Sequence, residues 1–179
     1  MTPWRAGTAA KRRAVLLAAC VLPLTACNPH QYDEVPAVHD ARPTELPGTW
    51  LGYDHTTVTL TPDGKATIGL LDGQEWDFDE GWRVSGTGTW KLTTHRTGWN
   101  DGQHVQLTLT TRTGSTTRPE ATSPVSPAPS TYTWTFELRR AEKAEEAKGA
   151  EGKELELYFF FGDPDSRSTY VLERQRTDA

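Results

Sequence analysis

Short runs in which apolar and polar residues alternate fill the chain from Pro47 onward, and this pattern restricts the fold more than any other feature of the sequence. Val58 and Leu60 alternate with threonines, and Tyr132 opens a longer run of the same kind. A period of two places every second side chain on one face, so each run predicts a half-buried β-strand. The predicted strands lie near 49–53, 57–61, 65–71, 84–94, 104–112, 132–139, 155–161 and 168–175.

Turn-forming residues separate the predicted strands, and no amphipathic helix long enough for a βαβ crossover interrupts them. Pro62-Asp63-Gly64 joins two of them, because proline presets φ and glycine accepts a positive φ. Consecutive strands of this kind predict an all-β fold, an eight-stranded antiparallel meander closed into a barrel, with an open sandwich as the alternative. Closure would remove the exposed edges of the sheet.

Three stretches depart from the alternating pattern and are expected to be connections. Residues 72–82 are acidic, carry three aromatic residues, and predict a loop or a short helical lid with its aromatics turned inward. Residues 114–130 are rich in Ser, Thr and Pro, and residues 140–153 consist of Ala, Glu, Lys, Arg and Gly. Neither of these two has an apolar stripe to bury, so both are predicted to be disordered loops between strands.

The first 26 residues carry the features of an export signal. Three consecutive basic residues, 11–13, precede an apolar run, 14–24, which is too short to cross a hydrocarbon core of about 30 Å as a helix. A basic region, a short apolar helix and small residues before a cleavage point are typical of a secretory signal peptide. The closing Leu24-Thr25-Ala26-Cys27 resembles the lipobox of bacterial lipoproteins.

The lipobox resemblance implies that Cys27 receives a diacylglyceryl group and becomes the first residue of the mature protein. Acyl chains such as palmitate would then hold the protein on the outer, extracytoplasmic face of the cell membrane, since two chains anchor stably where one does not. A plain secretory signal with an incidental cysteine is the alternative. Arg12-Arg13 also resembles part of a twin-arginine signal, so general secretory and twin-arginine export both stay open.

The mature part of the chain is acidic. The whole chain contains 19 Lys and Arg and 24 Asp and Glu. Four of the basic residues and none of the acidic ones lie in residues 1–26, so the mature part has 15 basic and 24 acidic side chains. The resulting net charge of −9 argues against nucleic acid as a partner and against electrostatic attachment to an anionic membrane. Cys20 would leave with the signal and Cys27 would become a thioether, so the domain would hold no free thiol and no disulfide.

Residues 28–46 contain three prolines and no periodic pattern, which predicts a flexible tether. Fully extended, such a segment reaches roughly 60 Å, so the domain could stand clear of the lipid surface. The predicted organisation is therefore a signal peptide at 1–26, a lipid anchor and tether at 27–46, and a β-barrel domain at 47–176.

Gly48-Thr49-Trp50 opens the first predicted strand and resembles the Gly-x-Trp signature of lipocalins. Arg174, in the last predicted strand, stands where that family sets an arginine across the tryptophan. The resemblance implies a closed, lipocalin-like or calycin-like barrel over about 46–176, with Trp50 and Arg174 in contact where it closes and a small apolar ligand inside. Residues 88–92 also resemble the opening string of fatty-acid-binding proteins, but they lie in mid-chain.

Motifs for catalysis, metals and cofactors are missing from the sequence. No Gly-x-Ser-x-Gly, no thiol nucleophile and no Walker-type loop is present, so the sequence predicts neither an enzyme nor a cofactor. The histidines lack metal-ligand spacing, and His95 and His104 are expected to be surface imidazoles. The acidic clusters at 72–80 and 163–165 lack calcium-loop spacing and are expected to be solvated.

The candidate ligand-binding residues are five aromatics: Trp90, Trp134, Phe136, Phe159 and Phe161. They either line a cavity for a small apolar ligand or fill the core, since the interior of an eight-stranded barrel is just wide enough for either. Two functions therefore stay open. The first is a lipid-anchored carrier of a small apolar ligand, and the second is a protein-interaction or inhibitor module at the cell surface with a filled core.

Overall fold

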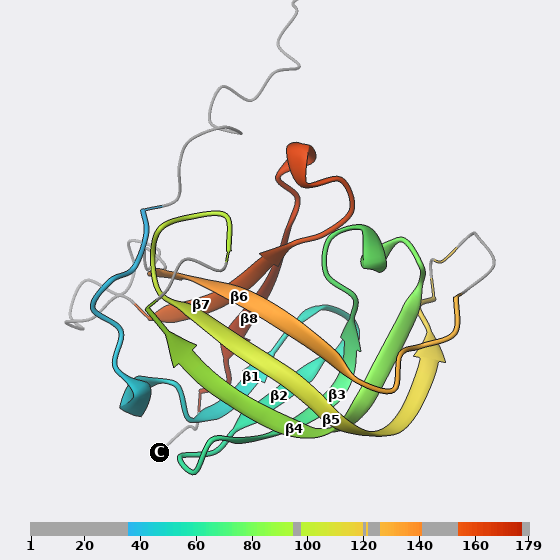
Figure 1. Ribbon diagram of the computed structural model, residues 1–179, viewed down its shortest axis with the longest axis horizontal. Coiled ribbons are helices and arrows are strands. Elements are labelled where there is room, and N and C mark those ends of the chain that lie inside the picture. Colours follow the sequence, from blue (N-terminus) through green and yellow to red (C-terminus); the bar gives the residue numbers. More distant parts are fainter. Residues whose placement is uncertain (1–35, 95–97, 120, 122–125, 141–153, 177–179) are drawn as a thin grey trace, which may run out of the picture. The chain divides into compact units, whose positions relative to one another are not determined.

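The computed structural model describes residues 36–94, 98–119, 121, 126–140 and 154–176, in which eight antiparallel strands form a closed barrel. Each strand pairs with the next along the chain and the last returns to the first, so the predicted meander barrel is confirmed (Figure 1). The strands are β1 (Gly48–Leu51), β2 (Thr57–Leu60), β3 (Lys65–Asp72), β4 (Trp82–Thr93), β5 (His104–Thr117), β6 (Tyr132–Arg140), β7 (Leu155–Phe160) and β8 (Thr169–Arg174). Short 3-10 turns lie in the connections: η1 (Pro43–Glu45), η2 (Tyr53–His55), η3 (Trp76–Phe78) and η5 (Pro164–Ser166).

Several predicted features lie outside the described residues. These are the signal peptide, Cys27, the tether up to residue 35, His95, residues 120 and 122–125 of the predicted loop 114–130, and 141–153 of the predicted loop 140–153. The remaining residue of that loop, Arg140, ends β6. In the part of the chain that the structure describes, no helix is long and apolar enough to cross a membrane.

The alternation of the sequence matches the two faces of the barrel wall. In β2 the exposed fractions of Val58 and Leu60 are 0% and 2%, whereas Thr57 is exposed. Inward side chains from every strand join one cluster of buried apolar residues, which includes the fully buried Trp50 and Trp134. Burying a large apolar side chain contributes about 1.5–3 kcal/mol, so this cluster is the main stabilising element of the described part of the chain, which contains no cysteine.

Two glycines let the long strands β4 and β5 approach each other closely. The pairing register shifts between Ser85 and Gly86 and again between Thr87 and Gly88. A Cβ on Gly88 would lie 1.9 Å from the carbonyl oxygen of Thr108, so no larger residue fits at this position without displacing backbone. The two register shifts bend the barrel wall where β4 pairs with β5.

β5 continues to Thr117, four residues into the predicted loop 114–130. Residues 114–117 pair with 82–85 of β4, so the prediction of a loop is wrong for them. The side chains of 111–117 are all exposed, and none of them is a large apolar residue. Backbone hydrogen bonds to β4 hold this arm, which is why alternation could not reveal it.

The end of the predicted tether packs on the barrel. Val38, Ala41 and Leu46 are at most 6% exposed and belong to the buried cluster. The side-chain amide of Gln103 accepts from the backbone N–H of Ala41 at 2.7 Å and donates to its carbonyl at 3.0 Å. Residues 36–46 therefore belong to the barrel domain, and the predicted boundary at 46 is wrong because three isolated apolar residues leave no periodic signal.

Candidate functional site

Four of the five predicted ligand-binding aromatics are packed inside the barrel. The exposed fractions are 0% for Trp134, 1% for Phe136 and Phe159, and 8% for Trp90. The rings of Phe136 and Phe159 lie 5.4 Å apart, and the indole N–H of Trp134 donates to the carbonyl of Asp72 at 2.7 Å. These side chains fill the core, while the fifth, Phe161, is half-buried and lines a groove along β8.

The predicted pair Trp50 and Arg174 lies at the seam where β1 meets β8. The two residues are opposite each other in the β1–β8 ladder, and the Arg174 guanidinium lies over the indole ring. The indole N–H donates to the carbonyl of Leu46 at 3.0 Å, and Arg174 donates to the carbonyl of Glu45. The structure thus brings the two residues together, next to the segment that enters the barrel.

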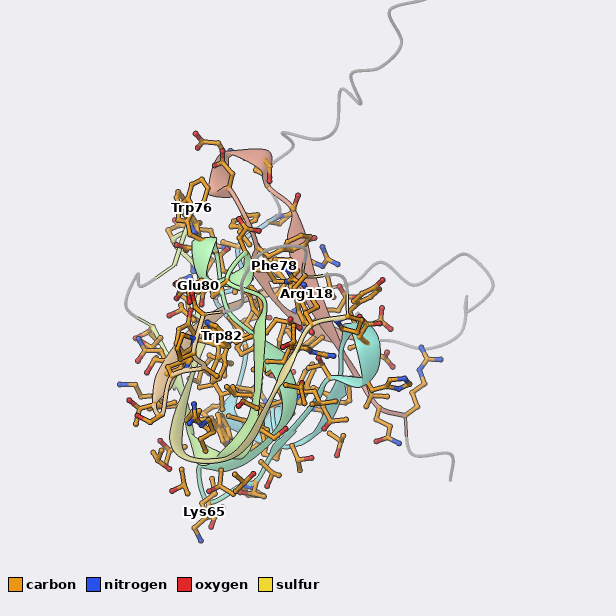
Figure 2. All side chains as sticks on the ribbon, turned by 90° about the vertical axis from the view of Figure 1, so that its right-hand side faces the viewer. Lys65, Trp76, Phe78, Glu80, Trp82 and Arg118 are labelled. Atoms are coloured by element: carbon orange, nitrogen blue, oxygen red, sulfur yellow. The ribbon has the colours of Figure 1, made fainter. Side chains whose placement is uncertain are left out.

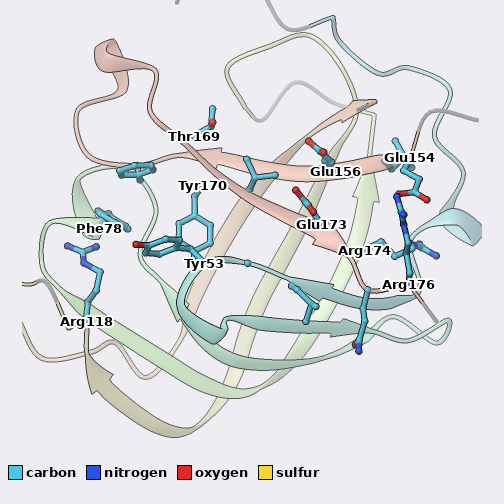
Figure 3. A pocket seen from close by; sticks show the side chains of 16 residues that line it. Tyr53, Phe78, Arg118, Glu154, Glu156, Thr169, Tyr170, Glu173, Arg174 and Arg176 are labelled. Atoms are coloured by element: carbon cyan, nitrogen blue, oxygen red, sulfur yellow. The ribbon is translucent and has the colours of Figure 1, made fainter. Parts of the chain in front are cut away.

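A groove of about 1350 Å³ follows β8 and includes the split between β8 and β1 (Figure 3). Its two ends differ in chemistry, as the labelled side chains of Figure 3 show. We call the part formed by Tyr53, Phe78, Arg118, Phe161 and Tyr170 the aromatic end. The other part is charged and carries Glu154, Glu156, Glu173, Arg174 and Arg176.

Phe78 is the centre of the aromatic end. Its ring centre lies 4.5 Å from that of Phe161 and 6.4 Å from that of Tyr170. The guanidinium carbon of Arg118 lies 3.5 Å from the Phe78 ring centre, and the two residues are neighbours in Figure 2. The aromatic end therefore combines an apolar wall with a cation held over an aromatic face.

A buried cluster of charges lies directly beneath this end. Asp72 and Arg83 approach to 3.2 Å, and Arg118 lies 3.7 Å from the other oxygen of Asp72. The side chains of these three residues are only 3%, 4% and 12% exposed. The Tyr170 hydroxyl also donates to Asp72, at 3.1 Å.

The guanidinium groups of Arg83 and Arg118 differ in the hydrogen bonds that they make. Arg83 donates to the carbonyls of Leu70 and Asp54 at 3.0 and 2.9 Å and to the Thr56 hydroxyl at 2.8 Å. In contrast, Nη1 of Arg118 is buried and has no hydrogen-bond partner among the described residues.

The cluster holds two guanidinium groups against one carboxylate. Burial raises the pKa of Asp72, although Arg83, Tyr170 and Arg118 each act to lower it. Burial likewise raises the pKa of Tyr170, so its hydroxyl stays protonated and neutral. Two guanidinium groups share this one carboxylate, so the cluster carries an excess positive charge that an anionic group of a bound molecule would balance.

Backbone strain is concentrated at the barrel end that carries the connections β1–β2, β3–β4 and β7–β8. The connections β1–β2, β3–β4 and β7–β8 must share one end in a meander, and Figure 2 places Trp76 of η3 far from Lys65 at the opposite end. Asp54, Glu75 and Arg167 have φ values of 48°, 53° and 53°, a region that non-glycine residues rarely adopt. Residues in such conformations often cluster at functional sites, so we take this end of the barrel as the candidate site.

Sequence reasoning missed a buried polar cluster on the outer face of β5 and β6. Glu137 points outward but is only 2% exposed, because the connection between β4 and β5 covers it. Its carboxylate accepts from the backbone N–H groups of Trp99 and Asn100 at 2.5 and 3.3 Å and from the Tyr158 hydroxyl at 2.9 Å. Alternation predicted an ordinary solvent-facing glutamate, so no signal in the sequence could have found this role.

His104 lies opposite Glu137 in the β5–β6 ladder and is fully buried. The prediction of a surface imidazole is therefore wrong for His104, again because the β4–β5 connection folds over this face. The described residues contain no group of three or more His, Cys, Asp or Glu side chains placed to hold a metal ion. The cluster's evident role is to fix the β4–β5 connection to the barrel wall.

Comparison with known proteins adds nothing to this geometry. Neither a protein-family model, nor a curated protein, nor a solved structure matches the chain. The closed eight-stranded meander is consistent with a lipocalin-like fold.

Proposed function

We propose that this protein is a lipid-anchored, extracytoplasmic protein-interaction module that uses its barrel as a packed scaffold and binds a partner in the outer groove. The lipobox-like Leu24-Thr25-Ala26-Cys27 supports attachment through a lipid on Cys27 and a location on the outer face of the cell membrane. The negative charge of the mature part supports a partner other than nucleic acid. No catalytic step and no cofactor form part of the proposal.

The observation that carries the proposal is the contrast between the packed interior and the open groove. Four of the five aromatics expected to line an internal cavity, Trp134 and Phe136 among them, are at most 8% exposed and belong to the buried core cluster. The groove of about 1350 Å³, in contrast, joins an aromatic end and a charged end along one strand. A partner that contacts both ends is extended, which favours a protein segment over a compact small molecule.

The composition of the groove also supports a protein partner. Interfaces combine a centre rich in aromatic residues and arginine with a polar rim. Tyr53 and Leu51, both in the groove lining, are 62% and 41% exposed, so the groove presents large apolar side chains to solvent. An inhibitor of a secreted enzyme is one form that such a module takes.

A small apolar ligand is the second candidate, and the aromatic end favours it. Phe78, Phe161 and Tyr170 form a compact apolar wall beside Arg118, large enough to hold one ring or a short chain. Such a ligand would bind against the outside of the core and would need no space within it.

Photo-crosslinking in intact cells tests the proposal. A photoreactive phenylalanine replaces the exposed Tyr53 in the groove, and in a control it replaces Thr89, an exposed residue of β4 outside the groove. A discrete protein adduct formed from position 53 and absent from position 89 is the expected result. Native mass spectrometry of the purified full chain is the companion measurement.

The two candidates give different outcomes in these measurements. A co-purifying small molecule, lost when Phe78 is replaced by Ala, together with no protein adduct at position 53, would favour the carrier and reject the interaction module. Equal adducts from positions 53 and 89 would show that the groove is not the binding surface.

A further inference from the structure

In one segment of β8, residues 169–172, the edge that faces β1 is not paired with another strand, although the barrel is closed. β1 pairs with β8 through Trp50 with Arg174 and Leu51 with Glu173, and the ladder among the described residues does not extend to 169–172. Beyond Leu51 the chain leaves the wall through η2, where Asp54 has a φ of 48°. The other edge of the same segment is fully paired, because residues 169–172 lie opposite 157–160 of β7.

The hydrogen-bonding direction of each β8 residue follows from two backbone contacts. The carbonyl of Ser168 accepts from Phe161 on the β7 side at 3.0 Å, and the N–H of Gln175 donates to Thr49 on the β1 side at 2.8 Å. Successive residues of a strand direct their backbone groups to opposite edges. Thr169 and Val171 therefore direct both their N–H and their C=O groups toward the β1 side.

No described residue takes up these groups. Neither the β1–β8 ladder nor any other backbone hydrogen bond among the described residues reaches Thr169 or Val171 on that side. Both residues line the groove, so the free edge forms one wall of it. The segment 169–172 is Thr-Tyr-Val-Leu, which has high strand propensity and carries neither the charge nor the proline that protects exposed edges.

The chemistry of this wall selects its occupant. Two donors and two acceptors that alternate at strand spacing are complementary to an extended peptide backbone and not to a lipid chain or a sugar. The aromatic end adds a charge requirement, since Arg118 shares the single carboxylate of Asp72 with Arg83 and its Nη1 has no hydrogen-bond partner among the described residues. An extended segment with a carboxylate satisfies both features at once.

We propose that the free edge of β8 binds an extended segment of a partner protein as an added strand, with a carboxylate of that segment on Arg118. This inference rests on the proposed protein-interaction function and names the chemistry of the partner. Backbone pairing with Thr169 and Val171 supplies the affinity, and Arg118 supplies the preference for an acidic side chain or a C-terminus.

A peptide array provides the probe, with the full chain as the binding protein. Eight-residue peptides of varied sequence are made in a carboxylate form, with Asp or Glu and a free C-terminus, and in a neutral form, with Asn or Gln and a C-terminal amide. A subset is expected to bind, with the carboxylate forms at least tenfold tighter. Arg118→Gln should remove this preference.

Val171→Pro tests the strand addition itself. Proline deletes one of the two N–H groups that face the groove and leaves the bonds from Leu172 to β7 in place, whereas Val171→Ala keeps this N–H and loses only side-chain atoms. Val171→Pro should weaken the binding of both peptide forms at least tenfold relative to Val171→Ala. Equal affinities of the two variants would overturn the proposal, as would an array in which no peptide binds.

Hydrogen exchange gives a readout that does not depend on any variant folding well. In the free protein the amide of Val171 should exchange much faster than that of Leu172, which faces β7. A saturating bound peptide should slow the Val171 amide at least tenfold, and an unchanged rate would contradict strand addition. Sedimentation tests a different occupant of the edge. If the wild-type protein is a dimer and Val171→Pro is a monomer, the edge binds a second copy of the chain and the proposal is overturned.

The crosslinking experiment separates this inference from the function on which it rests. A protein adduct at position 53 that persists in Val171→Pro would leave the interaction module standing and remove the added strand. If wild-type cells give no protein adduct at position 53, the interaction function fails as well.

Discussion

The guanidinium carbon of Arg174 lies 5.0 Å from the ring centre of Trp50, across the seam where the last strand pairs with the first. The indole is fully buried, and its contact with Arg174 is made where the barrel closes. An open sandwich would place these two residues on different edges of its sheets. Their contact is therefore a local test of closure, which the ladder between β1 and β8 shows independently.

A double-mutant cycle between Trp50→Ala and Arg174→Ala measures the strength of this contact. The cation–π pair should give a coupling energy of about 0.5–2 kcal/mol in urea unfolding. Trp50→Ala alone should cost about 3–5 kcal/mol, because it also leaves a cavity in the core. A coupling energy indistinguishable from zero would mean that the two side chains contribute to stability separately.

Gly88→Ala should destabilise the barrel, whereas Gly114→Ala should not. A Cβ on Gly88 would lie 1.9 Å from the backbone oxygen of Thr108, which must move, and such overpacking costs about 1–3 kcal/mol or more. A Cβ on Gly114 would meet nothing within 4 Å, so that change should stay within about 0.5 kcal/mol. The midpoint of urea unfolding checks both, and similar midpoints for the two variants would contradict the close approach of β4 and β5.

Asp63 in the β2–β3 turn should titrate well below other aspartates. Hydrogen bonds from Lys65 and from the Thr61 hydroxyl lower its pKa from 3.8 to about 2. A carboxyl with a lowered pKa stabilises the folded state above pH 3.8 and loses that contribution as the pH falls through about 2. An NMR titration of the side-chain carboxyl carbon measures this pKa.

The matched variants of this titration change only residue 65. Lys65→Met should raise the pKa of Asp63 toward 3.8, and Lys65→Arg should keep it low. A wild-type pKa close to 3.8 would show that the exposed side chains do not hold this geometry in solution.

Cys27→Ser should release the protein from the membrane or leave it unprocessed. Serine has no thiol to receive the diacylglyceryl group that the lipobox-like sequence predicts. The net negative charge of the mature part also disfavours electrostatic binding to an anionic membrane. Fractionation of cells into membrane and soluble material, with the mass of the product, measures the outcome. Continued membrane partitioning of a processed Cys27→Ser protein would refute the lipid anchor.

Alternation was enough to predict the strands because it reports the environment of a side chain directly. Val58 and Leu60 face the core and the threonines between them do not, so the period of two survives in the sequence. The same logic failed for 114–117, whose backbone pairs with β4 while all of its side chains face solvent. Pairing of this kind depends on main-chain groups that every residue shares, and it leaves no mark on composition.

The site residues were harder to predict, because their roles depend on neighbours far along the chain. Asp72, in a stretch expected to be solvated, is buried between Arg83 and Arg118. Glu137 sits in a regular alternating strand and is covered by a connection that begins more than thirty residues earlier. Neither residue differs locally from a surface acid.

The sequence by itself determined the all-β class, the order of the strands, and the Trp50 and Arg174 pair, since each depends on local periodicity or on a short motif. Only the tertiary structure decided that the aromatics fill the interior and that one edge of β8 stays free. The diameter of the barrel and the point at which β1 leaves the wall are properties of the closed sheet. They arise from the pairing of all eight strands together, and no single segment encodes them.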